Sequence, residues 1–448
     1  MEGHGPVFPL EIFRLVCIEL AERGDARTLF KCCLLSRGIA QFACRELYSS
    51  QEIDETDPFT SRPGYIQSII LSASGKTAFP YCTYLLALSL QDLENYLLRK
   101  VGADLSPEMV MTGTGTARVA QPEIEHGNSI FGYIKKYADD NEKAVALIQL
   151  ELSFNLHFPR GLLPSWIARL GVLKSLTIRE SSALDVDVAK AICEHCPHFY
   201  DLVYEITPGY SVDPKLCAFL ETLRPNRLQD LTLSWRTLDN VVPKEALTGL
   251  NTHATSLRTL QLNNISIKSM RALGSLAACT ALNALCIRVI SSEGDESQRT
   301  DTTDRRRQKL GKVISWICAC KSLKALEFER VEDVFLILES VLKSPDIRLE
   351  RLLVLDFHPL YNSEDGATWS ALRLQDQLKC LMMVLNSGHY HHGNWVHRMP
   401  GLVDSIYQLK NLTSLVFGRM KIRKLEIKGF TKVLPKLSKF YILAPNFH

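Results

Sequence analysis

The phrase L-x-x-L-x-L, in which each L is leucine or another large apolar residue, recurs along most of this 448-residue chain. Seven strict copies begin at Leu173, Leu228, Leu257, Leu282, Leu323, Leu352 and Leu412. Weaker copies begin at Val145, Phe199 and Leu437. The successive starts are 28, 26, 29, 29, 25, 41, 29, 60 and 25 residues apart, so seven of nine separations lie between 25 and 29. Such a period indicates an array of similar structural units.

Each copy predicts a short strand followed by a helix. The L-x-L alternation is typical of a strand with one buried face. The segments between strands carry apolar residues at helical spacing, as in Val188 and Ile192. One strand–helix unit cannot bury its own apolar face, so neighbouring units must stack. We therefore predict an α/β fold, a curved solenoid with parallel strands inside and helices outside. The structural alternative is an ordinary α/β domain with coincidental spacing.

The two longest separations predict interruptions of the array. The separation of 41 contains the hydrophilic stretch 291–309, which we interpret as an insertion. The separation of 60 fits either two periods with one degenerate copy or a single long insertion near 359–411. Residues 51–144 are interpreted as a connector with a first irregular repeat around Leu85, Leu88 and Leu90. The repeat domain is thus assigned to residues 145–448.

Cysteine stands three residues before the first apolar position in three units, as Cys196, Cys279 and Cys320. With this feature the array resembles the cysteine-containing subclass of leucine-rich repeats, which is common in ubiquitin-ligase receptors. Chemistry at these cysteines is not required to explain them. A small buried residue suits the place where a helix turns into a strand, because free cysteine packs as a small hydrophobe.

The first fifty residues differ from the repeats and predict three short helices. Pro9 suits the first turn of a helix on which Leu15 and Leu20 follow among apolar residues at helical spacing. Asp25 is a candidate N-cap for a second helix, and Ser36 is one for a third. A bundle of this size is marginal alone and needs a partner or the adjoining repeats for stability.

This N-terminal segment, residues 1–50, resembles an F-box, the motif that docks substrate receptors onto the Skp-type adaptor of cullin–RING ubiquitin ligases. It is similar to fungal members in particular. The matching residues are Pro9, Leu10, Glu11, Ile12, Leu15, Leu20, Asp25, Leu29, Cys32, Leu34, Leu35, Ser36, Arg37, Ala43, Leu47 and Tyr48. Phe8 stands where leucine is usual, and Ile39 stands where many animal members have tryptophan. The resemblance implies adaptor contacts by Pro9, Leu10, Glu11, Ile12, Leu15, Leu20, Leu29 and Leu35.

Strand alternation also predicts which side chains leave the core for the inner face of the solenoid. They mix aromatic, charged and amide groups, which suits a protein-binding surface. As substrate-binding candidates we take Arg179, Trp235, Asn263, Arg288, Glu329, His358, Arg419 and Tyr441.

The two resemblances together imply a non-catalytic receptor subunit of an SCF-type ubiquitin ligase. Its partners would be the Skp-type adaptor with the cullin–RING ligase and a protein substrate, and it would need neither a cofactor nor a metal. One alternative is a non-degradative F-box and repeat scaffold that holds a partner without turnover. The other is a metal- or nucleotide-dependent enzyme.

Composition excludes several classes of protein. Lysine and arginine number 52 against 49 acids, and a net charge of 52 − 49 = +3 is too balanced for a dedicated nucleic-acid binder. No apolar run approaches the about 18 residues of a membrane helix, and Glu11 and Arg14 break the stretch that a secretory signal would need. Thirteen cysteines without such a signal favour free thiols in a reducing compartment. We expect a cytoplasmic or nuclear protein without a membrane partner.

Three motifs could carry the enzyme alternative. The segment 74–77, Ser-Gly-Lys-Thr, resembles part of a phosphate-binding loop, but Ile70 stands where that loop needs glycine. Cys193 and Cys196 form a C-x-x-C pair, whereas a zinc site usually needs two such pairs. The segment 389–397 contains four histidines, which we interpret as an incidental feature of a solvated loop.

Two charge features remain. Arg305, Arg306 and Arg307 lie among five acids in the 291–309 stretch, and we interpret them as part of a solvated loop rather than a docking signal. Residues 405–448 hold nine lysines and arginines against one glutamate, a net charge of 9 − 1 = +8. We interpret these lysines as part of a soluble end cap that keeps the edge of the last strand unpaired, and the alternative is that they attract an acidic or phosphorylated partner.

Overall fold

The computed structural model describes a set of residues that covers the N-terminal helices and most of the repeats. They are residues 9–49, 68–69, 71–72, 76–77, 79–89, 132, 147–152, 162–179, 184–206, 213–235, 244–290, 303–331, 333–357, 365–385, 401–418 and 424–443. The chain divides into two compact units, residues 1–203 and 204–448.

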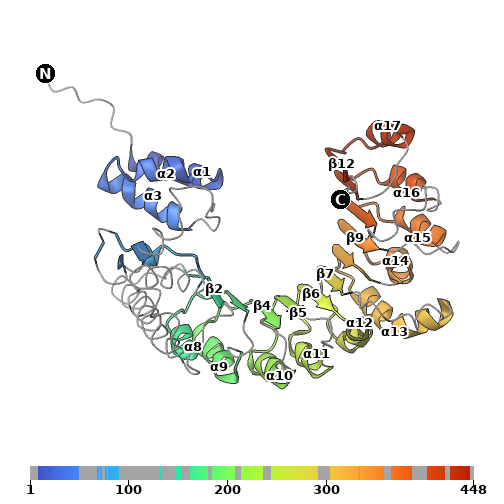
Figure 1. Cartoon of the computed structure of the whole chain (residues 1–448), viewed down its shortest axis with the longest axis horizontal. Coiled ribbons are helices and arrows are strands. Elements are labelled where there is room, and N and C mark those ends of the chain that lie inside the picture. Colours follow the sequence, from blue (N-terminus) through green and yellow to red (C-terminus); the bar gives the residue numbers. More distant parts are fainter. Residues whose placement is uncertain are drawn as a thin grey trace, which may run out of the picture. The chain divides into compact units, whose positions relative to one another are not determined.

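The first unit begins with the three predicted helices, α1 (Leu10–Glu22), α2 (Ala26–Cys32) and α3 (Arg37–Ser49), which pack as a bundle (Figure 1). Gly24 lies in the left-handed region at φ 69° and turns the chain between α1 and α2. The predicted caps are confirmed. The Asp25 carboxylate accepts hydrogen bonds from the N–H and hydroxyl of Thr28 at 3.0 and 2.7 Å, and the Ser36 hydroxyl accepts one from the Ile39 N–H at 3.3 Å.

A small apolar core holds the bundle together. Cys17, Leu29 and Ala43 are fully buried at its centre, one from each helix. Partly buried side chains surround them: Leu20, Ala21, Cys32, Cys33, Phe42 and Leu47. The Tyr48 ring at the end of α3 stacks on Tyr81 with centroids 4.8 Å apart, which ties the bundle to the 3₁₀ turn η2 (Tyr81–Thr83).

The rest of the first unit carries the first repeats. Its elements are β1 (Ala87–Ser89), β2 (Gln149–Leu152), α8 (Leu162–Ile167), β3 (Ser175–Ile178) and α9 (Val186–His195). The strands pair in parallel, and the register places Leu88 beside Leu150 and Leu150 beside Leu176. The irregular first repeat predicted at Leu88 is thus a strand. Strand β4 (Asp201–Ile206) crosses the boundary between the units.

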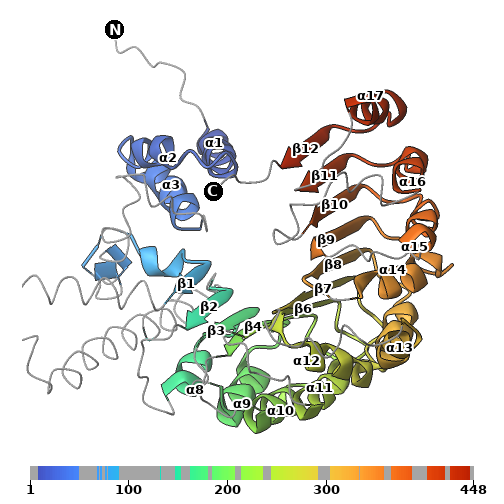
Figure 2. The same cartoon turned by 45° about the vertical axis from the view of Figure 1, so that its right-hand side comes forward.

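The second unit alternates helices and parallel strands throughout its described part (Figures 1 and 2). Its elements are α10 (Asp213–Thr222), β5 (Asp230–Trp235), α11 (Lys244–Leu250), η4 (Asn251–His253), β6 (Thr259–Ile265), α12 (Ile267–Ala272), η5 (Leu273–Leu276), β7 (Ala284–Val289), α13 (Thr303–Ala319), β8 (Ala325–Glu329), α14 (Val334–Lys343), β9 (Arg351–Phe357), α15 (Asp365–Leu372), β10 (Cys380–Leu385), α16 (Leu402–Gln408), β11 (Ser414–Gly418), α17 (Lys424–Val433) and β12 (Lys439–Leu443). The order of β5 to β12 in the sheet is their order in the chain.

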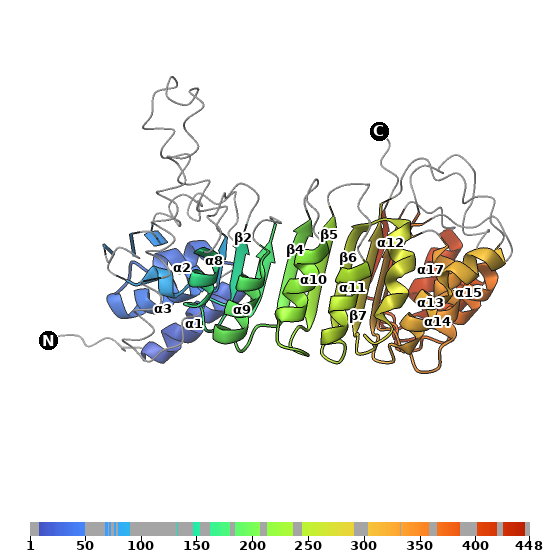
Figure 3. The same ribbon diagram turned by 90° about the horizontal axis from the view of Figure 1, so that it is seen from below.

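The helices cover one face of the sheet and leave the other face to the polar side chains. Figure 3 shows α10 and α11 in front of the strands, and Figure 2 shows α13 to α17 along one side of β7 to β12. The leucines of the repeat stack in register between strands and helices, as Leu260, Leu285 and Leu326 do in β6, β7 and β8. The predicted α/β repeat fold with parallel strands is confirmed.

Two copies of the repeat lie in a different register from the predicted one. In β9, Leu352 pairs with Leu326, so the unit is Leu349, Leu352 and Val354 instead of a unit beginning at Leu352. Residues 352 to 355 are all apolar, so alternation alone could not choose the buried face, and strand pairing decides it. In β2 the unit is likewise shifted. Leu150 was predicted at the third apolar position of its unit, but it pairs with Leu176, which holds the second position of the next unit.

The separation of 60 residues is resolved as two periods. Strand β10 lies inside it, with Leu378, Leu381 and Met383 buried at the repeat positions. Of the two interpretations, two periods with one degenerate copy is therefore confirmed, and a single long insertion near 359–411 is wrong. Methionine at the third position hid this copy from the leucine pattern. The predicted 291–309 insertion is also too long, because α13 begins at Thr303; residues 291–302 lie outside the described residues.

The cysteines before the strands are structural, as expected. The Cys196 thiol donates to the Leu170 carbonyl at 3.4 Å, and Cys320 donates to the Cys279 carbonyl of the previous repeat at 3.5 Å. Burial raises the pKa of Cys196 and Cys320 to about 12 and that of Cys279 to about 11. Their thiols satisfy backbone groups between repeats and stay protonated.

Candidate functional site

Large apolar side chains are exposed on the N-terminal bundle, where a compact protein would bury them. We define the N-terminal apolar surface as Leu10, Ile12, Leu15, Val16, Phe30, Leu34 and Leu35. Their exposed fractions run from 40 to 74%. Exposed apolar side chains on a small helical bundle make it a candidate for a protein-interaction site.

The sequence of α1 creates this surface because it carries two apolar stripes. Cys17, Leu20 and Ala21 face the bundle core. Ile12, Leu15 and Val16 are spaced three and four residues apart, and they form a second stripe on a different side of the same helix. Within the described residues the second stripe remains exposed.

The turn between α2 and α3 supplies the rest of the surface. Leu34 and Leu35 lie in that turn, where their N–H groups bond the carbonyls of Lys31 and Cys32 at 3.0 and 3.2 Å. Gly38 in the first turn of α3 lies beside Leu10, whose Cδ2 is 3.3 Å from the place that a Cβ at Gly38 would take. The start of α1 and the start of α3 therefore lie together.

The structure separates the predicted adaptor residues into two groups. Pro9, Leu10, Glu11, Ile12, Leu15 and Leu35 are exposed. Leu29 is 1% exposed in the bundle core and Leu20 is half-buried against that core, so direct docking by Leu29 is a wrong prediction. Leu29 points into the core because α2 packs on α1 and α3 with that side. The predicted adaptor contacts did not include the exposed residues Val16, Phe30 and Leu34, although Leu34 is among the residues that match the F-box.

Four cysteines lie in or beside the bundle core. The sulfur atoms of Cys33 and Cys44 are 3.5 Å apart. The hydrogen bond with Cys44 lowers the pKa of Cys33, whereas the same bond and burial raise that of Cys44. Burial raises the pKa of Cys17 to about 11 and also raises that of Cys32.

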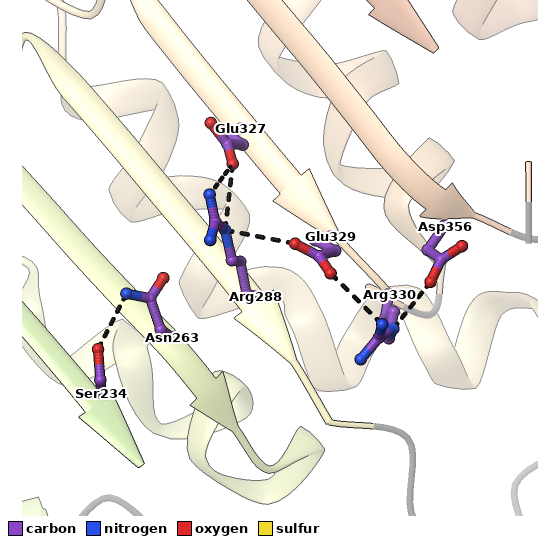
Figure 4. A network of polar contacts seen from close by, with 7 residues as sticks. All are labelled: Ser234, Asn263, Arg288, Glu327, Glu329, Arg330 and Asp356. Carbon is purple, nitrogen blue, oxygen red and sulfur yellow. Dashed lines mark hydrogen bonds and ion pairs between the residues drawn. The ribbon is translucent and has the colours of Figure 1, made fainter. Parts of the chain in front are cut away.

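A second candidate surface follows the strands of the second unit. We define the polar strand row as Ser234, Asn263, Arg288, Glu327, Glu329, Arg330 and Asp356, which lie on or next to β5 to β9 (Figure 4). Arg288 Nη2 lies 2.7 Å from Glu327 Oε1, and Arg288 Nε lies 3.3 Å from Glu329 Oε2. Arg330 Nε lies 2.9 Å from Asp356 Oδ2, so guanidinium and carboxylate groups alternate along the row.

Local backbone geometry positions part of this row. Asn264, Arg330 and Asp356 all have φ between 53° and 61°, in the left-handed region. Strand pairing shifts register beside Asn264 in β6 and beside Asp356 in β9, as in a β-bulge. These irregularities interrupt the strands where the polar side chains gather. The Asn263 amide donates to Ser234 Oγ at 3.0 Å, and its Oδ1 accepts no bond from any described residue.

The structure places the predicted substrate residues in different surroundings. Asn263, Arg288 and Glu329 lie together in the polar strand row. Arg179 is half-buried in the first unit with Nε 2.8 Å from Glu151, and Tyr441 is exposed on β12. His358 and Arg419 lie outside the described residues.

Trp235 is 2% exposed, and its prediction as a surface residue is wrong. It lies two residues after Leu233 and four after Leu231, so the strand alternation places all three on the buried face.

The described residues give no further support to the three sequence motifs that could indicate an enzyme. Within the described residues, no group of three histidine, cysteine, aspartate or glutamate side chains could hold a metal ion. Cys196 of the C-x-x-C pair is buried and bonded as described above. Lys76 is exposed and the Thr77 hydroxyl donates to the Phe79 carbonyl at 2.6 Å, while Ser74, Gly75 and the histidines of 389–397 lie outside the described residues.

The three arginines predicted in a solvated loop lie instead on helix α13. Arg306 Nη1 is 2.6 Å from Asp333, and Arg307 Nη2 is 3.0 Å from Glu339. Asp333 immediately precedes α14 and Glu339 lies within it, so these ion pairs hold neighbouring helices together.

No helix in the described part of the chain is long and apolar enough to cross a membrane.

Comparisons with known proteins found similarities to solved structures. No protein-family model matches the chain, and no curated protein matches it. Among solved structures, the yeast complex of Rad7 and Elc1 has a chain that is 13% identical, with a TM-score of 0.41; the match covers 79% of this chain and 95% of that one.

Two bacterial structures are similar as well. The leucine-rich repeat-containing protein LegL7 from Legionella pneumophila is 17% identical, with a TM-score of 0.36 and coverage of 67% of this chain and 84% of that one. A leucine-rich-repeat protein of Leptospira interrogans is 13% identical, with a TM-score of 0.19 and coverage of 68 and 97%.

Proposed function

We propose that this protein is the substrate-recognition subunit of an SCF-type cullin–RING ubiquitin ligase. It docks a Skp-type adaptor through residues 9–49 and a protein substrate through its repeats. The observation that carries the proposal is the N-terminal apolar surface. Leu10, Ile12, Leu15 and Leu35, four of the eight positions that the F-box resemblance assigns to the adaptor, are among its seven exposed residues.

The energetics of this surface suit a stable complex. Burying a large aliphatic side chain contributes about 1.5–3 kcal/mol. The seven side chains of this surface, six aliphatic and one aromatic, are each 40 to 74% exposed and supply the apolar centre of an interface. The capped turns at Asp25 and Ser36 hold the three helices in place before binding, which reduces the entropy lost on association.

The repeats supply a surface for the second partner. The polar strand row offers charged groups of both signs on adjacent strands. Such groups set the specificity of a protein interface more than its affinity. A receptor of this kind performs no chemistry itself. It holds the substrate near the conjugating enzyme of the ligase and so raises the effective concentration of the substrate lysine there.

The first test is co-purification of the full-length chain with a Skp-type adaptor. The wild type is compared with the Pro9→Ala, Leu10→Lys double variant. We expect a one-to-one complex with the wild type and its loss with the variant, because an ammonium group cannot be buried unpaired in an apolar interface. Leu374→Lys is the matched control, because Leu374 is an equally exposed leucine (50%, against 49% for Leu10) in the second unit.

Failure of a well-folded wild type to bind the adaptor would contradict the proposal. The N-terminal helices would then be a cap of the repeat array. Adaptor binding without any effect of the chain on the lifetime of its partners would favour the non-degradative scaffold, which differs from the receptor only in turnover.

A further inference from the structure

The last strand of the array has an open edge. Strand β12 pairs with β11, and no other strand in the described part of the chain pairs with it. Lys439 donates its N–H to the carbonyl of Thr413, the residue before β11, at 3.0 Å. Because alternate residues of a parallel strand bond to opposite sides, the N–H groups of Phe440 and Ile442 point to the open edge.

This edge also exposes apolar side chains. Ile442 pairs with Phe417 and so occupies a core position of the repeat. Phe417 is 2% exposed, whereas Ile442 is 40% exposed because no described repeat follows it. Tyr441 and Leu443 on the other face of the strand are exposed as well. A further strand beside β12 would bury these side chains and satisfy the open edge.

The charge around the edge is strongly positive. Exposed lysines lie on α17, on β12 and in the turns before them, at Lys410, Lys428, Lys432, Lys436 and Lys439. Lys436 Nζ bonds the neutral amide oxygen of Asn411 at 2.6 Å, and Lys410 Nζ bonds the Val433 carbonyl at 3.4 Å. None of the five forms an ion pair with a described residue, so no described acid offsets their charge.

We propose that this C-terminal edge, formed by Tyr441, Ile442, Leu443 and the five lysines, binds an extended acidic segment of a partner protein. The segment adds a strand beside β12. Its apolar residues cover Ile442 or Tyr441, and its carboxylates face the lysines. A second copy of this chain is a poor occupant, because the net charge of 9 − 1 = +8 in residues 405–448 would repel an identical edge.

This proposal does not rest on the adaptor docking proposed above. The edge lies within residues 204–448, whereas the adaptor surface lies within residues 9–49. Either surface can therefore fail its test without affecting the other.

The test uses the full-length protein and three fluorescein-labelled peptides of equal length, measured by fluorescence anisotropy. The peptides alternate valine with aspartate, with asparagine or with lysine. We expect the aspartate peptide to bind at least about 10-fold more tightly than the asparagine peptide, and more weakly as salt is added. The lysine peptide is expected not to bind.

Two variants separate the backbone edge from the charge. Ile442→Pro removes an N–H from the open edge while leaving the bonds to β11, and we expect it to abolish binding of the aspartate peptide. Ile442→Val keeps the N–H and should bind as the wild type does. The Lys436→Glu, Lys439→Glu double variant should weaken binding by more than about 10-fold. Its matched control is Lys215→Glu, Lys268→Glu, which reverses two exposed lysines on α10 and α12.

Equal binding of the aspartate and asparagine peptides would overturn the proposal, and so would full binding by a folded Ile442→Pro variant. If circular dichroism shows that the Ile442→Pro variant does not fold, the Lys436→Glu, Lys439→Glu double variant decides the question. Sedimentation velocity gives a further decisive outcome. A wild-type dimer that Ile442→Pro converts to a monomer would assign the edge to a second copy and overturn the acidic segment.

Discussion

Arg288 on β7 donates two hydrogen bonds to one carboxylate oxygen of Glu327 on β8, from Nη2 at 2.7 Å and from Nε at 3.1 Å. The Glu327 side chain is 15% exposed, so the bonded carboxylate is largely removed from water. Charge-assisted bonds of this kind are stronger than neutral ones, and they fix the guanidinium in one orientation. The pair therefore makes part of the polar strand row rigid.

We expect Arg288→Met to lower the free energy of unfolding by about 1 kcal/mol, because it leaves the Glu327 carboxylate buried without its main donor. Combining it with Glu327→Gln should recover part of this loss. A urea-unfolding double-mutant cycle measures the coupling between the two side chains. Lys379→Met is the control. It removes a 2.6 Å ion pair with Glu350, but that lysine is mostly exposed and the loss should be smaller. A coupling of zero would show that the pair contributes no stability.

The two leucines Leu15 and Leu29 should respond to mutation in opposite ways. Leu29→Ala removes a fully buried side chain from the bundle core and should cost about 2–4 kcal/mol of stability in the helices. Leu15→Ala changes a 62% exposed side chain and should leave the unfolding transition unchanged. If the adaptor docks as proposed, Leu15→Ala still weakens the complex. Hydrogen exchange of α1 to α3 measures the first effect, and adaptor titration measures the second. Equal destabilisation by both changes would contradict the assigned faces of the helices.

The repeat fold could be predicted because leucine alternation repeats the same information at every strand. The prediction from leucine alternation was incomplete where the pattern of apolar residues was ambiguous. The register of β9 was wrong because Leu352, Leu353, Val354 and Leu355 are all apolar. Strand β10 was only one of two alternatives because Met383 stands at a leucine position. Both are settled by pairing with neighbouring strands, which a single repeat does not encode.

The candidate sites were predictable to a smaller extent. The exposed leucines of α1 follow from the F-box resemblance, but the burial of Leu29 depends on how three helices pack. The Arg288–Glu327 pair joins residues 39 positions apart, across a stretch of hydrophilic sequence. No spacing rule connects such residues, because their contact arises only when β7 pairs with β8.

His253 should make the stability of the second unit depend on pH. It is fully buried, and its Nε2 donates to the Leu220 carbonyl at 3.1 Å. Burial lowers its pKa below the ordinary value of 6.5, although the bond to Leu220 opposes this. Below pH 6.5 the unfolded chain therefore binds a proton that the folded chain does not, so stability is complete above that pH and falls as the pH drops below it.

We expect His253→Gln to lose less stability than the wild type between pH 7.5 and pH 5.5, by up to about 1.4 kcal/mol per pH unit. Glutamine can replace the histidine donor, because Gln375 makes the equivalent bond to the Leu342 carbonyl at 3.0 Å in a later repeat. Thermal unfolding at both pH values measures the difference. His195→Gln makes the same substitution at an exposed histidine of α9 and serves as the matched control. Identical profiles for His253→Gln and the wild type would contradict the assignment.

Cys33 should be the most reactive thiol of the N-terminal bundle. The hydrogen bond with Cys44 lowers the pKa of Cys33, while burial raises the pKa of Cys17 to about 11. The thiolate is the reactive form, so iodoacetamide at neutral pH should modify Cys33 first. Cys44→Ala removes the hydrogen bond and should move the pH profile of Cys33 alkylation upward, whereas Cys32→Ala should leave it in place. Mass spectrometry of the alkylated peptide across a pH series separates this change in pKa from a change in access, which alters the rate equally at every pH. A profile that Cys44→Ala does not move would show that the bond between the two sulfur atoms does not stabilise the thiolate.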